Sequence, residues 1–273
     1  MPMAELTASP VTSRRWRKPP LIRNPWLRWG LLIGALIYLA VAISSVPVDD
    51  ARIARGLERG GRMISSFLRP DFASRWYDIQ IGVLESLTMT VVSTVAGVLL
   101  SVPVGLGAAR NLVSAPIYLA CRSIITISRT FQEVVIAIVF VVMFGFGPLA
   151  GVCTLAFATI GFMAKLLAED IEEIDPAPLE AIRATGAGWL KTVTYAVMPQ
   201  VSARLVGLSV YRFDINLRES AIVGIVGAGG IGSTLQTTFN RYDYDVAAAI
   251  LLIIIVLVMT TELVSGHIRR RLQ

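Results

Sequence analysis

Six apolar runs constrain the fold of this chain more than any other feature of its sequence. They occupy residues 26–46, 79–109, 117–146, 149–168, 201–213 and 246–264. A helix of about 20 apolar residues crosses a bilayer, and inside the bilayer only helices and closed barrels satisfy every backbone hydrogen bond. Because 55% of the residues are hydrophobic and only 16% are charged, the sequence predicts an all-α membrane protein with about six transmembrane helices.

Positive charge lies beside the first and last of these runs. The formal net charge is +6, and basic residues gather within residues 1–25 and again at His267, Arg269, Arg270 and Arg271. Basic residues that flank membrane helices favour the cytoplasmic side. We therefore expect a basic cytoplasmic tail at residues 1–25 and a cytoplasmic C-terminus, and we interpret the charge as a topology signal, not as a nucleic-acid site. No secretory cleavage site follows the run at residues 26–46, which we interpret as a retained transmembrane helix.

Residues 51–70 form a different kind of segment. Its apolar residues fall on one helical face and its arginines on the other: Ile53, Leu57, Ile64 and Leu68 against Arg52, Arg55, Arg59 and Arg62. This pattern predicts an external amphipathic helix that lies along the membrane surface. The alternative is a contact surface for an external binding protein.

Residues 175–199 are the one sizeable polar stretch in the second half of the chain. Asp175 can cap a helix, and Pro176 suits a first turn that needs no N–H donor. We expect a short helix at residues 179–185, ended by Gly186, and then a second helix that runs through Pro199 into the next apolar run.

One face of the short helix carries only small side chains. Ala177, Ala181 and Ala184 recur at positions i, i+4 and i+7, so another protein's backbone could approach this face closely. A generic connection between two membrane helices would not need such a face, although it remains the alternative.

This stretch resembles the EAA loop of ABC importer permeases, whose pattern is E-A-A, three residues, G, nine residues, I-x-L-P. Four positions match it, namely Glu180, Ala181, Gly186 and Pro199, and three apolar positions differ, namely Ile182, Ala196 and Met198. In that family the loop is a cytoplasmic coupling helix that docks on the ATPase subunit. The resemblance implies a coupling segment at residues 170–192, with Glu180, Ala181, Ala184, Gly186 and Pro199 as ATPase-coupling residues.

Charged residues interrupt the run at residues 117–146. Charges inside membrane helices are rare and usually face the bundle interior or a cavity. Arg129 and Glu133 are spaced i, i+4 and could pair, while Arg122 could extend to the cytoplasmic interface. Two interpretations stay open, a structural pair and a lining of the substrate pathway.

A glycine-rich stretch lies between the last two runs. Gly227, Gly229, Gly230 and Gly232 satisfy the dinucleotide pattern G-x-G-x-x-G, and residues 221–226 look like a strand. A dinucleotide fold also needs a surrounding parallel sheet, and here a membrane run follows almost at once. We therefore expect these glycines to serve close packing or a gate-like re-entrant loop.

No site for a nucleotide or a metal is expected in this chain. At residues 186–192 leucine stands where a P-loop needs the glycine before its lysine. Cys121 and Cys153 lie in apolar runs, His267 is the single histidine, and no metal-ligand spacing occurs. If ATP drives this protein, we expect a partner ATPase to bind the ATP and Mg²⁺.

Residues 211–218, followed by the glycine-rich stretch, look like the phosphonate branch of these permeases. That branch carries an aromatic–Arg–Phe–acid–x–Asn–x–Arg sequence before Val-Gly-Ala-Gly-Gly-Ile-Gly, and only the acidic Glu219 stands where a small residue is expected. The resemblance covers about residues 79–272, as a MetI-like importer-permease core to which the first helix and the amphipathic segment are added. The substrate-pathway candidates are Arg129, Glu133, Arg212, Asn216 and Arg218, with Arg212 and Arg218 at the outer end of the fifth helix.

The resemblance implies a permease of an ATP-driven importer for a phosphonate or related phosphorus oxyanion in the bacterial cytoplasmic membrane. Its implied partners are ABC ATPase subunits, a periplasmic or lipid-anchored binding protein and a second permease copy in a homodimer. The arginines could instead be interface anchors paired with Asp214 and Glu219. The alternatives are a membrane-embedded enzyme that acts on phosphate-bearing lipid head groups and a passive channel.

Overall fold

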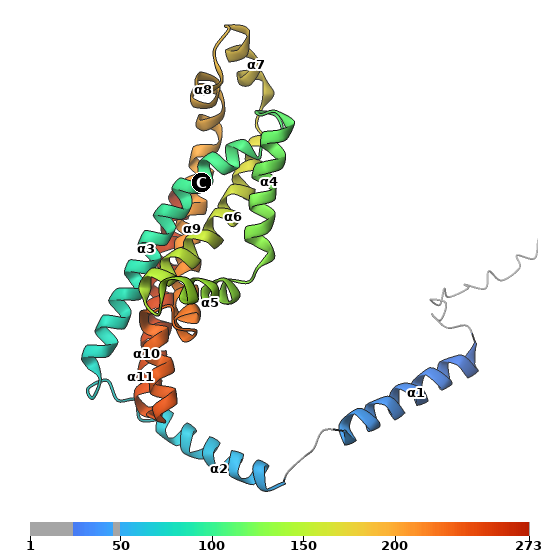
Figure 1. Ribbon diagram of the computed structural model, residues 1–273, viewed down its shortest axis with the longest axis vertical. Helices are drawn as coiled ribbons and strands as arrows, with labels where there is room; N and C mark the ends of the chain where they lie inside the picture. Colours follow the sequence, from blue (N-terminus) through green and yellow to red (C-terminus); the bar gives the residue numbers. More distant parts are fainter. Residues whose placement is uncertain (1–23, 46–49, 273) are drawn as a thin grey trace, which may run out of the picture. The chain divides into compact units, whose positions relative to one another are not determined.

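The computed structural model describes residues 24–45 and 50–272, and every regular element within them is helical (Figure 1). The chain divides into two units, Met1–Arg59 and Gly60–Gln273. The expected basic tail at residues 1–25 lies, except for its last two residues, outside the described part.

The first unit contains α1 (Pro25–Ser44), which is the expected N-terminal transmembrane helix. Asn24 caps it by accepting a hydrogen bond of 3.1 Å from the backbone N–H of Trp26. Within its unit α1 buries no side chain, as an isolated apolar helix would. The helix α2 (Asp50–Phe67) begins in this unit and continues into the second, and the apolar residues of its expected face are exposed. Its position on a membrane surface stays a prediction.

Four long helices run along the second unit (Figure 1): α3 (Trp76–Gly107), α6 (Pro148–Glu172), α9 (Met198–Ile225) and α11 (Tyr244–Leu272). Shorter elements connect them: α4 (Ala115–Thr130), α5 (Glu133–Phe144), α7 (Pro176–Ala184), α8 (Trp189–Thr192), a π-helical turn (Val193–Val197) and α10 (Gly230–Arg241). In the described residues, five helical stretches are long and apolar enough to cross a membrane, or six if α4 and α5 form one broken span. The expected number of about six agrees with this.

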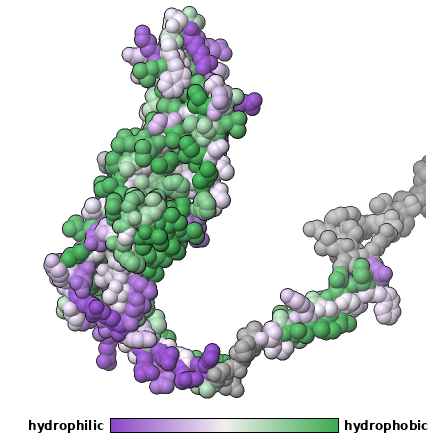
Figure 2. All heavy atoms as spheres, viewed as in Figure 1, coloured by the Kyte–Doolittle hydropathy of each residue, from purple (hydrophilic) through white to green (hydrophobic). Residues whose placement is uncertain are grey.

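Figure 2 shows where polarity changes along the second unit. On the visible face, apolar side chains gather around its middle and hydrophilic ones toward its two ends. Many large apolar side chains of α3, α5 and α11 are exposed. An exposed apolar band of this kind fits a helix bundle whose solvent is lipid.

The run at residues 117–146 does not form one helix, as the sequence had suggested. Phe131 and Gln132 are extended, and α4 and α5 meet at an angle of 95°, so that α5 lies across the bundle (Figure 1). Glu133 is the first residue of α5, where the positive end of the helix dipole stabilises a carboxylate. Because the break separates Arg129 from Glu133, no ion pair joins them in the described residues. Of the two interpretations left open, the one that made them a structural pair was wrong.

The fifth membrane helix is longer than residues 201–213, since α9 continues to Ile225. The strand-like residues 221–226 are therefore mostly helical, which was not expected from their β-branched composition. Buried neighbours on α3 and α10 favour a helix there over local strand propensity.

Glycines turn the chain between α9 and α10. Gly227, Gly229 and Gly230 have positive φ angles of 98°, 80° and 70°, which L side chains rarely adopt. Gly227 also accepts a hydrogen bond of 3.0 Å from the N–H of Gly147, so this turn is joined to the turn before α6. A Cβ atom on Gly232 would lie 1.9 Å from the carbonyl oxygen of Ala221, which means that α10 packs backbone to backbone against α9.

Two side chains of α3 accept hydrogen bonds from the first turn of α10. Glu85 accepts a hydrogen bond of 2.9 Å from the N–H of Gly230, and Ser86 accepts one of 2.9 Å from Ile231. The N–H groups of a first helical turn have no partners within their own helix. Glu85 and Ser86 of α3 therefore cap α10.

We expect Gly232→Ala to destabilise the protein strongly, because its Cβ would collide with backbone and not with a movable side chain. Overpacking costs about 1–3 kcal/mol even where side chains can shift. Thermal unfolding of the purified protein in detergent measures the effect. Gly266→Ala on α11, which meets nothing within 4 Å, is the matched control, and an equal loss in both variants would contradict the close approach.

Candidate functional site

The short helix α7 forms where the sequence predicted it. Asp175 caps it by accepting a hydrogen bond of 2.9 Å from the N–H of Ala177. Gly186, with a φ of 76°, ends it, as expected for a residue that follows a helix C-terminus. The predicted second helix is also present, as α8, the π-helical turn and α9, and it runs through Pro199.

The small side chains of α7 face outward. Ala177, Ala181 and Ala184 are exposed together with Glu180, whereas Leu179 is buried. The predicted ATPase-coupling residues of α7 thus form one accessible surface of small side chains with a carboxylate at its edge. We call the end of the second unit that carries this surface the α7 end.

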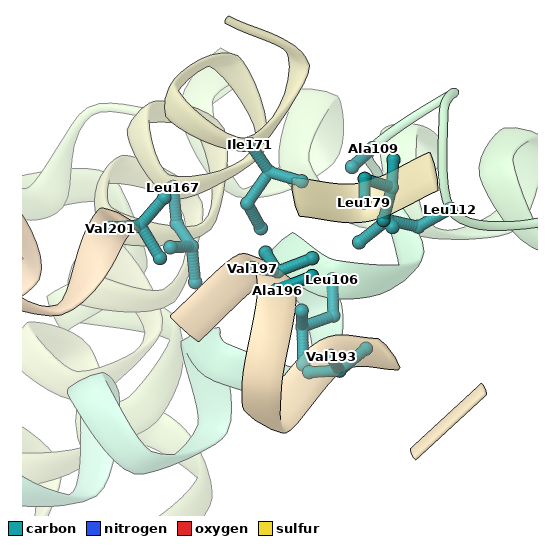
Figure 3. Close-up of a cluster of buried hydrophobic side chains, with 10 residues drawn as sticks. All are labelled: Leu106, Ala109, Leu112, Leu167, Ile171, Leu179, Val193, Ala196, Val197 and Val201. Carbon is teal, nitrogen blue, oxygen red and sulfur yellow. The ribbon is translucent and has the colours of Figure 1, made fainter. Parts of the chain in front are cut away.

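A hydrophobic cluster joins this surface to the bundle (Figure 3). It brings Leu179 of α7 together with residues of the π-helical turn, of the connection between α3 and α4, and of the ends of α3, α6 and α9: Leu106, Ala109, Leu112, Leu167, Ile171, Val193, Ala196, Val197 and Val201. Burial of a leucine stabilises a fold by about 1.5–3 kcal/mol. Through Leu179, α7 is therefore packed into a cluster that also contains residues of α3, α6 and α9.

Hydrogen bonds strengthen the same junction. Arg183 donates to the carbonyl of Asn111 over 3.0 Å, and the indole N–H of Trp189 donates to the carbonyl of Leu112 over 3.2 Å. Gln200 of α9 accepts from the N–H of Asp175 over 3.0 Å. The coupling segment is thus bound to the connection between α3 and α4 and to the start of α9.

The α7 end also holds Arg122. Its guanidinium donates to the carbonyl of Ala108 and to Glu172, each over 3.0 Å. Glu172 in turn accepts from the N–H of Arg110 over 2.9 Å. Of the two interpretations of this arginine, the structural one is favoured, because its donors bind the ends of α3 and α6.

A second polar cluster lies near the middle of α9. Arg212 has a side chain that is only 4% exposed, and it pairs with Glu219 over 3.1 Å. Its Nε donates to Thr159 of α6 over 3.0 Å, and its guanidinium lies 5.4 Å from the ring centroid of Phe162. The expectation that Arg212 sits at the outer end of its helix was wrong, because α9 extends well beyond it.

Asn216 links three helices in this cluster. Its amide donates to Thr94 of α3 over 2.8 Å and to Thr159 of α6 over 3.1 Å. A fully buried amide needs such partners, since leaving one unpaired costs about 1–3 kcal/mol. Asn216 is therefore placed as a structural link between α3, α6 and α9.

The remaining pathway candidates lie around this cluster. Arg218 pairs with Asp214, and its side chain is 44% exposed whereas that of Asp214 is 2% exposed. Arg129 is exposed on α4, and Glu133 is half-buried at the start of α5. Arg212 and Arg218 do pair with Glu219 and Asp214, as one interpretation expected. These pairs lie within α9 and not at its end, where interface anchors were expected.

Two residues of this cluster, Thr94 and Thr159, were not predicted from the sequence. Both lie in apolar runs, where a single threonine usually bonds the carbonyl four residues earlier, as Thr159 does with Leu155 over 2.6 Å. Their importance comes from Asn216, a distant residue that no local spacing connects to them.

The fold and these clusters define the class of protein. The family described as binding-protein-dependent transport system inner membrane component matches residues 101–273. The chain belongs to this family, whose members are transport permeases, and this membership excludes the alternative of a lipid head-group enzyme.

Individual relatives agree with this assignment. The chain is 46% identical over 204 residues to the phosphate-import permease protein PhnE of Mycolicibacterium smegmatis. The aligned region covers 74% of this chain but only 38% of that longer protein. It is 32% identical over 259 residues to the phosphite transport system permease protein PtxC of Stutzerimonas stutzeri, over 93% of this chain and 94% of the relative. An inward-facing structure of the MetNI methionine ABC transporter matches with a TM-score of 0.61 and 26% identity, over 70% of this chain and 94% of that one. The expected MetI-like core is thus confirmed.

We expect Leu179→Ala to lower the free energy of unfolding by about 2–5 kcal/mol, because it leaves a cavity where α7 meets the bundle. Leu190→Ala, at an exposed position on α8, should change it little. Thermal unfolding in detergent compares the two, and equal effects would contradict the anchoring role of Leu179.

We expect Thr159→Val to destabilise the protein by about 1–3 kcal/mol, because Arg212 and Asn216 both lose a buried acceptor. Thr154→Val is the matched control on the same helix, since Thr154 is equally buried but bonds only the carbonyl of Ala150. Similar unfolding temperatures for the two variants would show that the network contributes nothing.

Proposed function

We propose that this chain is the permease subunit of an ATP-driven importer that moves a phosphonate or a related phosphorus oxyanion across the cytoplasmic membrane. The surface of α7 is the observation on which this proposal depends. It presents Glu180, Ala181 and Ala184 to a partner while Leu179 fixes the same helix to the bundle. Such an element can bind a moving subunit and pass its motion on.

The partner on this surface is an ABC ATPase subunit, which binds ATP and Mg²⁺. Gly186 ends the docking helix, and Pro199 begins the helix that carries the motion into the membrane. Binding-protein-dependent relatives support a substrate-binding protein at the opposite end. The basic residues after the last run support a cytoplasmic α7 end, because the C-terminal part of α11 lies beside the first half of α9.

A second copy of the chain completes the pathway as a homodimer. A phosphorus dianion is costly to remove from water and needs cationic donors along its route. Arg218 and Arg129, both exposed, supply such donors, and Glu133 at the start of α5 is a further pathway residue. Arg212 and Asn216 both bind Thr159 and thereby connect α9 to α6. The turn at Gly227, Gly229, Gly230 and Gly232 forms the gate beside them. The names of the phosphate and phosphite relatives support this class of cargo.

We expect Glu180→Arg to abolish both binding-protein-stimulated ATP hydrolysis and cargo uptake, because it reverses the charge at the docking surface. The full complex in liposomes, with phosphonate, phosphite and phosphate offered separately, provides the measurement. Glu173→Arg, an exposed reversal just before α7, is the control. Normal transport by a correctly inserted Glu180→Arg complex would overturn the coupling role of α7.

A further inference from the structure

Two grooves with opposite chemistry flank α9 where it meets α11. One, of about 420 Å³, is lined by apolar residues that include Val206, Phe213 and Val264. The other, which we call the polar groove, has a volume of about 620 Å³ and is lined by Gln200, Arg204, Tyr211 and Arg269, and also by Ala203, Gly207 and Leu208. The α9 residues of the two grooves lie on opposite faces of the helix, because their positions differ by about half a helical turn.

The polar groove holds more positive than negative charge. Arg204 pairs with Asp170 of α6 over 3.0 Å and still exposes 62% of its side chain. The guanidinium of Arg269 lies 5.2 Å from the ring centroid of Tyr211, and its Nε donates to the carbonyl of Ser265 over 3.4 Å. Among the residues that the structure describes, no carboxylate lies within ion-pair distance of Arg269. Two guanidinium groups therefore face this space against a single carboxylate.

The two grooves cannot both face lipid. An arginine in contact with the hydrocarbon of a bilayer costs several kcal/mol, whereas the apolar groove suits acyl chains. The polar groove therefore faces water or protein. It lies at the α7 end, because Gln200 also accepts a hydrogen bond from the coupling segment at Asp175.

The chemistry of the lining matches an oxyanion. Guanidinium groups bind phosphate-like groups with paired N–H donors, and the amide of Gln200 and the hydroxyl of Tyr211 can add further hydrogen bonds. A volume of about 620 Å³ lies within the range of small-molecule sites, so it admits the anion together with part of its hydration shell.

We propose that this groove is an oxyanion-binding site on the cytoplasmic half of the pathway, where Arg204 and Arg269 hold the phosphorus group of the cargo before its release. The proposal rests on the function proposed above and adds a site to it, distinct from the buried cluster of Arg212. Because Gln200 touches both the site and Asp175, the site lies one side chain away from the coupling segment.

Thiol modification tests this site without measuring transport. The full chain, assembled with its ATPase subunits in nanodiscs, carries Cys121→Ala, Cys153→Ala and a new thiol in the groove, Ala203→Cys. An anionic methanethiosulfonate reagent should modify this thiol about 10-fold faster than it does after Arg269→Gln. Orthophosphate, compared with sodium chloride at equal ionic strength, should slow the modification several-fold only while the arginines are present.

The apolar groove supplies the matched control. Ser209→Cys, which lies there, should react slowly with the anionic reagent and gain no protection from orthophosphate. Arg269→Gln is preferred to Arg204→Gln, because it removes positive charge without leaving Asp170 unpaired. Protection that is absent at Ala203→Cys, or that persists after Arg269→Gln, would overturn the site.

The two proposals fail in distinguishable ways. A complex that imports a phosphorus oxyanion but shows no protection at Ala203→Cys refutes only the groove site. A complex that shows protection but imports none of these compounds refutes the proposed function and leaves an oxyanion site of another purpose.

Discussion

Each charge inside this apolar bundle requires a partner of its own, and this constraint organises the packing of the helices. The cost of an unpaired buried ion exceeds the net stability of most folds. Arg212 is matched by Glu219 and Arg218 by Asp214 along α9, while Asp170 of α6 binds Arg204 of α9. The pair between Asp170 and Arg204 joins α6 to α9 and helps to specify which faces of these helices meet, a task that apolar side chains perform poorly when lipid is equally apolar. The other two pairs neutralise charge within α9.

The same constraint explains how the two ends of the bundle differ. At the α7 end, Arg122 of α4 joins the ends of α3 and α6 through Ala108 and Glu172, and a hydrophobic cluster holds α7 against the bundle (Figure 3). At the opposite end, Glu85 of α3 caps α10 behind a turn of glycines. The α7 end is therefore held together by buried side chains and an ion pair, whereas the other end depends on backbone packing with few side chains.

Local sequence signals were sufficient wherever neighbouring residues decide the structure. The cap at Asp175, the end of α7 at Gly186 and the exposed alanine face follow from spacing alone, and all are present. The break in α4–α5 and the length of α9 could not be derived in this way. Both segments have partners distant in sequence: Ser128 at the end of α4 donates to the carbonyl of Phe157 on α6, and Arg212 and Asn216 of α9 donate to Thr159.

The sequence by itself determined the class of fold, the approximate number of membrane helices and the position of the short capped helix α7. These depend on apolar length, helical periodicity and capping, which act over a few residues. Only the tertiary structure decided which arginines are buried and paired, such as Arg212, and which stay accessible, such as Arg218, Arg204 and Arg269. The physical reason is that the energy of a charge depends on the dielectric and the partners that surround it, and these are supplied by other helices.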